Sequence, residues 1–165
     1  MERRESFKVV VAKDYLKFSA AHFIAYPGFR EPLHGHNYRV SVEVAGELGP
    51  QGYVVDFGIV KKLARAVCAE LDEKVLVPAR SDCLAVREEG DCISLRSESG
   101  EFRFPRRDCV LLPIVHSSAE ELARYLAGEL LAALGREGVT KVASIEVGVE
   151  ETPGQTAYFR LDSSS

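Results

Sequence analysis

Three histidines are the residues of this chain whose types and spacing most clearly indicate chemistry. His34 and His36 flank Gly35 in a stretch that is expected to be extended. Because alternate side chains of a strand point to the same face, the two imidazoles should project toward one point in space. His22, on another strand-like run, is the nearest candidate for a third ligand. Three neutral imidazoles leave one tetrahedral position open, which is typical of a catalytic zinc rather than a structural one.

The length and charge of the chain narrow the class of protein. Its 165 residues are most simply one domain, residues 1–165, long enough to bury roughly 70% of the unfolded surface without a disulfide. The net charge of −4 comes from interspersed acids and bases, without a basic block that could follow a phosphate backbone. We therefore expect no nucleic-acid partner.

The first residues and the cysteines favour a cytoplasmic protein. The only apolar run near the start, residues 9–12, is too short for a signal peptide or a membrane span, so we expect no membrane partner. The four cysteines, Cys68, Cys83, Cys92 and Cys109, form no Cys-x-x-Cys pair. They are expected to be reduced thiols, with a disulfide or a cysteine zinc site as the less favoured alternative.

Four segments read as long strands. Residues 7–23 are rich in valine and aromatic residues, with an interruption near residues 13–14 that predicts a turn or a bulge. Residues 38–44 alternate apolar and polar, as a half-buried antiparallel strand does. Residues 142–149 and 156–161 predict two final strands joined by a loop over 150–155. Residues 25–32 carry two prolines and a glycine and predict a loop.

Two helices are predicted by their capping residues. Asp56 is a suitable N-cap for a helix that runs to about Asp72, with an apolar stripe at helical spacing. Ser118 and Glu121 form a capping box for a second helix, which Gly135 or Gly138 would end. Between them, residues 79–109 form short apolar runs separated by turn residues, and they predict a small strand-rich insertion rather than a separate domain.

Taken together, these motifs resemble the family of 6-pyruvoyl-tetrahydropterin synthase and 6-carboxytetrahydropterin synthase. The resemblance covers most of the chain apart from residues 79–109. It rests on Phe18-Ser19-Ala20-Ala21-His22, His34-Gly35-His36-Asn37-Tyr38, Val54-Val55-Asp56-Phe57-Gly58, Leu71-Asp72, Ser118-Ala119-Glu120-Glu121-Leu122-Ala123 and Glu151-Thr152.

The resemblance implies a fold and a set of ligands. The fold is an α+β T-fold of order ββααββ: an antiparallel four-stranded sheet with two helices on one face, closed into an oligomeric barrel as a homotrimer or homohexamer with active sites at subunit interfaces. The cofactor is a zinc ion on His22, His34 and His36. The substrate is a pterin, 7,8-dihydroneopterin triphosphate, held by Glu151 with Ser118 and Ala119 beside it. A carboxylate suits that role because it can accept two parallel hydrogen bonds from the ring.

The segment before His34 departs from the usual family pattern. The family's cysteine base lies four residues before the first histidine, and that place is Arg30 here. Glu31 follows, which resembles a variant branch in which a glutamate replaces the cysteine. That branch is associated with cleavage of the pterin side chain between its first two carbons, to give 6-hydroxymethyl-7,8-dihydropterin.

A second departure follows the first predicted helix. The family normally has Leu-Asp-His, in which the aspartate and histidine transfer protons, whereas this chain has Leu71, Asp72 and Glu73. Glu73 cannot replace an imidazole at neutral pH unless its pKa is raised by burial or by Asp72. Asp72 and Glu73 are candidate catalytic residues, and His116 is a candidate for the missing imidazole.

The resulting hypothesis is a zinc-dependent carbon-oxygen or carbon-carbon lyase with Glu31 as base. Formation of 6-carboxytetrahydropterin, on the queuosine route, and formation of a 6-pyruvoyl product stay open. The competing class is a T-fold protein that binds zinc and pterin but has lost efficient turnover.

Overall fold

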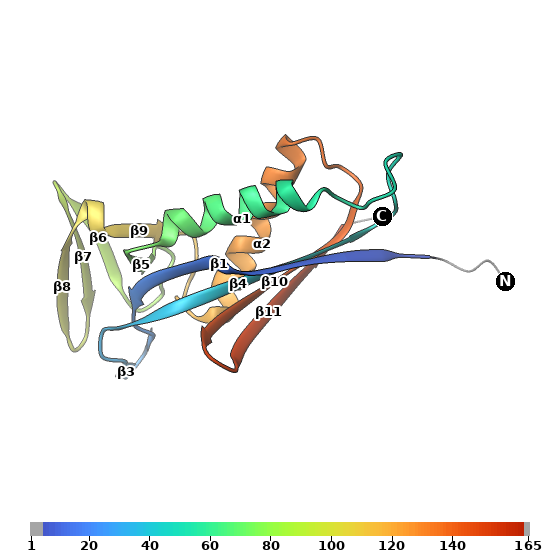
Figure 1. Ribbon diagram of the computed structural model, residues 1–165. Helices are drawn as coiled ribbons and strands as arrows, with labels where there is room; N and C mark the ends of the chain where they lie inside the picture. Colours follow the sequence, from blue (N-terminus) through green and yellow to red (C-terminus); the bar gives the residue numbers. More distant parts are fainter. Residues whose placement is uncertain (1–4, 164–165) are drawn as a thin grey trace.

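Residues 5–163 are described by the computed structural model, in which one sheet and two helices dominate (Figure 1). The strands of this sheet lie in the order β11-β10-β4-β1-β5-β9. Their bounds are β1 (Phe7–His22), β4 (His34–Gly46), β5 (Lys74–Pro78), β9 (Cys109–Leu112), β10 (Val142–Thr152) and β11 (Gln155–Asp162).

The four long strands are antiparallel, as predicted. β1 pairs with β4, β4 with β10, and β10 with β11. The interruption predicted in the first strand is a shift in the register of β1 against β4, between Ala12 and Lys17. Two short strands extend the sheet beyond the predicted four, because β5 runs parallel to β1 and β9 runs parallel to β5. The predicted four-stranded antiparallel arrangement is thus confirmed for the long strands, and the whole sheet is mixed.

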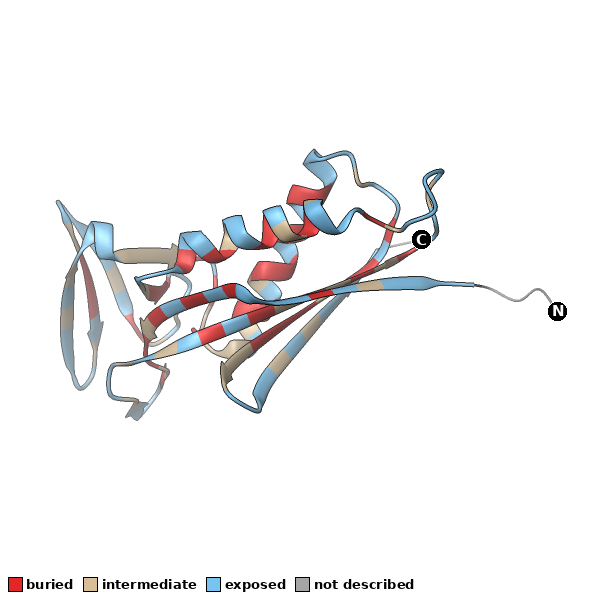
Figure 2. Cartoon of the chain, viewed as in Figure 1, coloured by how far each residue is buried: buried red, intermediate tan, exposed pale blue. Residues whose placement is uncertain are grey.

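Both predicted helices are present and cover the same face of the sheet (Figure 1). They are α1 (Phe57–Leu71) and α2 (Ala119–Arg136). Asp56 caps α1 by accepting a hydrogen bond from the Ile59 N–H at 3.1 Å. Their apolar faces pack on the buried side of the long strands, where buried and exposed positions alternate (Figure 2).

The ends of α2 explain why this helix stops and starts where it does. Ser118 accepts a hydrogen bond from the Glu121 N–H, as the capping box requires, but the Glu121 carboxylate bonds the N–H groups of Val115 and His116 rather than that of the cap. At the other end Gly138 has a φ of 82°, a left-handed conformation that glycine adopts without steric cost. The Val139 N–H reaches the Leu134 carbonyl and closes a Schellman motif.

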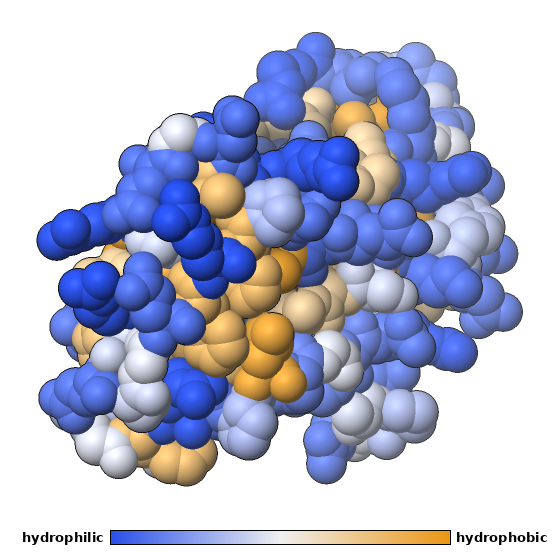
Figure 3. Space-filling model, turned by 90° about the vertical axis from the view of Figure 1, so that its left-hand side faces the viewer, coloured by the Kyte–Doolittle hydropathy of each residue, from blue (hydrophilic) through white to orange (hydrophobic). Residues whose placement is uncertain are grey.

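The strand-rich insertion predicted at residues 79–109 forms a second sheet. Its strands are β6 (Ala85–Glu89), β7 (Cys92–Ser97) and β8 (Gly100–Pro105), followed by the short helix η1 (Arg106–Asp108). This sheet lies at the end of the molecule opposite the two termini (Figure 1). Ile93 and Leu95 of β7 are buried with Phe23 and Ala25 in a second hydrophobic cluster, separate from the main core. Seen from this end, apolar side chains gather in the middle of the face, with hydrophilic side chains around them (Figure 3).

Two segments predicted as loops contain strands. Residues 25–32 include a short hairpin of β2 (Ala25–Tyr26) and β3 (Phe29–Arg30), because Gly28, with a φ of 83°, permits a tight turn. The predicted loop over 150–155 is shorter than expected, since β10 continues to Thr152 and β11 begins at Gln155. Glu151 therefore lies on a strand rather than in a loop.

Among the helices that the structure describes, none combines the length and apolar character needed to cross a membrane.

The N-cap of α1 provides a test of the fold. Replacing Asp56 with Ala removes the hydrogen bond to the Ile59 N–H and should lower the free energy of unfolding by about 1 kcal/mol. Urea denaturation at a fixed protein concentration measures this change. Asp56→Asn, which keeps an acceptor, should retain most of the stability; an equal loss in both variants would show that the hydrogen bond is not the cause.

Candidate active site

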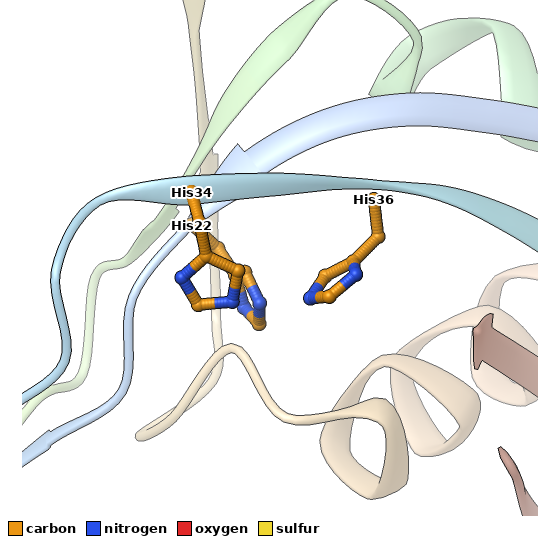
Figure 4. A group of neighbouring side chains, drawn as sticks. All are labelled: His22, His34 and His36. Atoms are coloured by element: carbon orange, nitrogen blue, oxygen red, sulfur yellow. The ribbon is translucent and has the colours of Figure 1, made fainter.

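The three histidines predicted to bind a metal lie together at one end of the β1–β4 pair. His22 lies opposite His34 across the two strands, and His36 lies opposite Ala20, so all three project from the same face of the sheet. One ring nitrogen from each lies within 4.8 Å of the others. Their rings point into a common space next to the segment that leads into α2 (Figure 4).

Hydrogen bonds to carbonyl oxygens fix two of these rings. His22 Nδ1 is 2.8 Å from the Ser117 carbonyl oxygen, and His34 Nδ1 is 2.8 Å from the Pro32 carbonyl oxygen. Since a carbonyl can only accept, Nδ1 carries the hydrogen in both rings and Nε2 presents its lone pair. This is the arrangement by which protein histidines are oriented toward metal ions.

Burial favours the neutral, metal-binding form of His22. Its side chain is only 2% exposed, and its Nε2 has no hydrogen-bond partner among the described residues. Burial lowers the pKa of His22, and the hydrogen bond to Ser117 only partly opposes this effect. An unpaired buried nitrogen is costly unless something satisfies it. A metal ion would do so, and three imidazole nitrogens fit zinc with one position left for a substrate or water.

A cavity of about 510 Å³ opens beside the three rings. Its walls contain all three histidines together with Glu31, Ser118, Ala119 and Glu151. The structure therefore brings together seven of the residues that the sequence singled out. Glu120, in the first turn of α2, also lines this cavity.

The two carboxylates of the cavity are held differently. Glu31 accepts a hydrogen bond from the Ile24 N–H at 2.8 Å, while its own N–H donates to the Ile24 carbonyl at 2.9 Å. Glu151 lies closer to the histidines, with one carboxylate oxygen 3.4 Å from His22 Nε2 and 3.5 Å from His36 Nε2. One carboxylate is thus anchored to the backbone beside the cavity, and the other lies against the metal-binding nitrogens.

Two buried residues at the site were not predicted. Ser117 is fully buried, contacts the His22 ring and donates a hydrogen bond from its hydroxyl to the Phe23 carbonyl. Tyr38 is also fully buried, and its hydroxyl has no hydrogen-bond partner within residues 5–163. Burial raises the pKa of Tyr38, and the negative charge of Glu151 adds to this effect. The motif around His36 contains Tyr38, but only the fold shows that its hydroxyl faces the site.

Three predicted catalytic residues lie elsewhere. Asp72 accepts a hydrogen bond from the Ser19 N–H at 2.8 Å, and the Glu73 N–H donates to the Ser19 carbonyl at 2.7 Å. These bonds attach the end of α1 to β1, which gives Asp72 a structural role. Glu73 lines a second cavity of about 540 Å³, together with Ser19, Asn37 and His36, and His36 lines both cavities. Ser19 and Asn37 alternate with the histidines along β1 and β4, so their side chains point to the opposite side of the sheet.

His116 is the third of these residues. Its N–H donates to Glu121 at 2.7 Å, and it precedes Ser117, which contacts the metal-binding ring. Of the described residues, those that line the metal cavity do not include His116. The segment before α2 therefore contributes Ser118 to the cavity wall and Ser117 to the contact with His22, and the role of His116 as the missing imidazole stays a prediction.

Comparison with known sequences indicates one family. The family model described as 6-pyruvoyl tetrahydropterin synthase matches residues 11–162. A protein of Methanocaldococcus jannaschii, named putative 6-carboxy-5,6,7,8-tetrahydropterin synthase, is 35% identical over 150 residues, which cover 88% of this chain and 90% of that protein. Dihydroneopterin monophosphate aldolase of Pyrococcus furiosus is 42% identical over 59 residues, which cover 36% of this chain and 50% of that protein.

Comparison with solved structures agrees. A 6-pyruvoyltetrahydropterin synthase from Plasmodium vivax superposes with a TM-score of 0.89 and 39% identity, covering 96% of this chain and 99% of that one. That structure is of a mutant in which a glutamate, named as a catalytic residue, is replaced by alanine.

The metal site can be tested by removing one ligand. The protein as purified should contain about one zinc ion per chain, and His34→Ala should lower the zinc affinity by more than roughly 100-fold, because even loss of an outer hydrogen-bond partner costs about 10- to 100-fold. Elemental analysis and zinc titration measure this. His116→Ala is the matched control and should retain its zinc. Equal zinc contents in the wild-type protein and His34→Ala would contradict the assignment.

The unpaired hydroxyl of Tyr38 leads to a prediction about stability. Tyr38→Phe removes the hydroxyl but keeps the ring stacked on Phe18, whose centroid is 4.7 Å away. The hydroxyl meets the geometric criteria of a hydrogen bond with no described residue, although Glu151 lies near enough to it to raise its pKa. The free energy of unfolding should therefore fall by less than about 0.5 kcal/mol, or rise. Tyr38→Leu, which removes the ring, should lower it by more than about 1 kcal/mol. A large loss in Tyr38→Phe, measured by thermal unfolding, would reveal a partner for the hydroxyl.

Proposed function

The chain belongs to the 6-pyruvoyl tetrahydropterin synthase family, and we propose that it is a zinc-dependent lyase that acts on 7,8-dihydroneopterin triphosphate or a close pterin. The proposed product is 6-hydroxymethyl-7,8-dihydropterin, formed by cleavage between the first two carbons of the side chain. The observation that carries this proposal is the convergence of three histidines and two carboxylates, Glu31 and Glu151, on one cavity.

The residues of the cavity divide the tasks that such a reaction needs. When bound by the three histidines, zinc would lower the pKa of the substrate hydroxyls and polarise a developing carbonyl. Glu151 would accept hydrogen bonds from the pterin ring and so orient the side chain. Ser118 and Ala119, at the N-terminus of α2, line the same cavity and would border the ring.

Glu31 would act as the general base. It takes the proton from the hydroxyl on the second carbon of the side chain, and the electron pair of that O–H bond forms an aldehyde as the bond between the first and second carbons breaks. The electrons of the broken bond pass to the first carbon, which takes up a proton and becomes the hydroxymethyl group. The same carboxyl can return its proton there, so the step needs no oxidant or reductant.

The position of Arg30 supports a carboxylate base. Arg30 stands where the family usually has its cysteine, yet it lines a separate cavity of about 450 Å³ formed with the insertion. Glu31 lines the metal cavity. Two similarities support the same choice: the partial match to a protein named as an aldolase, and the glutamate named as catalytic in the Plasmodium vivax protein.

A second candidate is 6-carboxytetrahydropterin synthase activity. It is favoured by the name of the Methanocaldococcus jannaschii relative, which matches most of this chain. The same cavity would bind the same substrate class, so the two candidates differ in product rather than in site.

We also propose that the active protein is a homotrimer or a pair of trimers. The strand β11 ends the sheet on one side, and β1 pairs with β5 only at Ala20 and Ala21, so the first half of β1 has a partner on one side only among the described residues. Unpaired edges of this kind are sites of strand pairing. In such an assembly the cavity that contains Glu73 would face a neighbouring subunit. Asp72 and Glu73 would then act across the interface.

Product analysis tests this function. Zinc-loaded protein incubated with 7,8-dihydroneopterin triphosphate should give 6-hydroxymethyl-7,8-dihydropterin, and Glu31→Gln should lower kcat by at least about 100-fold, the usual contribution of a general base. Chromatography of the pterins measures both. Glu150→Gln is the control, because Glu150 directly precedes Glu151 on β10, and it should keep wild-type activity.

Three results would change the proposal. A 6-carboxy product would select the second candidate. Pterin binding without turnover would indicate a binding protein that has lost catalysis. Full activity in Glu31→Gln would show that another group is the base.

A further inference from the structure

We propose that residues 79–109 hold the segment that carries Glu31, and that Arg30 transmits this support, so that Arg30 is a positioning residue for the base. The inference rests on the proposed role of Glu31. It assigns a purpose to the insertion, whose role the sequence leaves open.

The guanidinium of Arg30 is held by the insertion. Its Nε donates a hydrogen bond to Ser99 Oγ at 3.0 Å, and Ser99 lies in the turn between β7 and β8. The central carbon of the guanidinium lies 4.9 Å from the ring centroid of Phe102 on β8 and 5.6 Å from that of Phe23. The positive charge therefore rests against two aromatic faces, which attract it.

The same guanidinium also holds the backbone of the base. Arg30 Nη1 donates to the Glu31 carbonyl at 2.9 Å. The side chain of Glu31 is fixed from the other side, where it accepts the Ile24 N–H at 2.8 Å. Glu31 thus has its main chain bonded to Arg30 and its carboxylate bonded to Ile24, so a displacement of Arg30 should loosen the carboxylate.

A second contact joins the insertion to the same hairpin. Cys83 Sγ donates to the Ala25 carbonyl at 3.1 Å, and Ala25 is the partner of Arg30 in the β2–β3 pair. Ala25 and Phe23 are buried in the second hydrophobic cluster with residues of β7. The insertion therefore contacts both strands of the hairpin, and the cavity between them shares no lining residue with the cavity beside the histidines.

The geometry requires arginine rather than any cation. One planar group donates from Nε in one direction and from Nη1 in another while its face lies on Phe102. Lysine has a single ammonium group on a flexible stem and cannot make this set of contacts together. Arg30→Lys therefore keeps the positive charge but cannot keep the two hydrogen bonds and the contact with Phe102 together.

The kinetic test compares Arg30→Lys in two backgrounds, with zinc-loaded full-length protein and 7,8-dihydroneopterin triphosphate. In the wild-type background kcat should fall by about 10- to 100-fold, the usual effect of a misplaced catalytic group, while KM changes by less than about twofold and the zinc content stays the same. In the Glu31→Gln background the same substitution should change the residual kcat by less than about twofold, because residues that act through one another are not additive. Arg96→Lys, which alters an insertion arginine paired with Glu101, is the matched control and should keep wild-type kcat.

A second measurement does not depend on activity. The Ile24 N–H is bonded to the Glu31 carboxylate, so its hydrogen exchange should become at least about tenfold faster in Arg30→Lys, with unchanged exchange in the middle of β4. Unchanged exchange at Ile24, or an equal loss of kcat in both backgrounds, would overturn the proposal. If Glu31→Gln were fully active, the proposed base would be wrong, and the exchange of Ile24 would alone decide whether Arg30 holds this segment.

Discussion

The pairing of β1 with β4 is the constraint on which the site depends. Before the register shift, odd-numbered residues of β1 face the helices: Val9 lies opposite Val44, and Val11 lies opposite Val42. After the shift, even-numbered residues of β1 face that side, and His22 lies there opposite His34. Because side chains alternate along a strand, an uninterrupted β1 would turn His22 to the other side of the sheet. The shift between Ala12 and Lys17 thus allows one strand to contribute both to the core and to the histidine cluster.

The buried polar atoms at the site fit this view. Within residues 5–163, the buried side-chain polar atoms without a hydrogen-bond partner are His22 Nε2 and the Tyr38 hydroxyl. Both lie where the three histidines and Glu151 converge, and the main core around them is apolar. Unpaired buried polar groups are rare in proteins and concentrate where a ligand or ion completes the site. Among the described residues, unpaired buried side-chain polar atoms therefore occur at this site alone.

Much of the fold and part of the candidate site could be predicted from local sequence patterns. The two helices follow from Asp56 and Ser118 as caps, and the grouping of the histidines follows from strand alternation. The parallel pairing of β5 and β9 could not be predicted, because it joins two short runs that the insertion separates in the sequence. The contact of Ser117 with His22 also joins residues far apart in the chain. The bond between the Asp72 carboxylate and the backbone of Ser19 is of the same kind, because no spacing in the sequence reveals it.

The three histidines and Glu31 depend on different parts of the molecule. His22 and His36 lie on long strands that also form the main core, whereas Glu31 follows a two-stranded hairpin that packs on the insertion and the second hydrophobic cluster. Substitutions in the hairpin and the insertion can therefore accumulate without loosening the strands that hold the three histidines. A fold built in this way allows the residue at position 31 to change during evolution while the histidine cluster is kept, which would give selection a route from one reaction to another within a single fold.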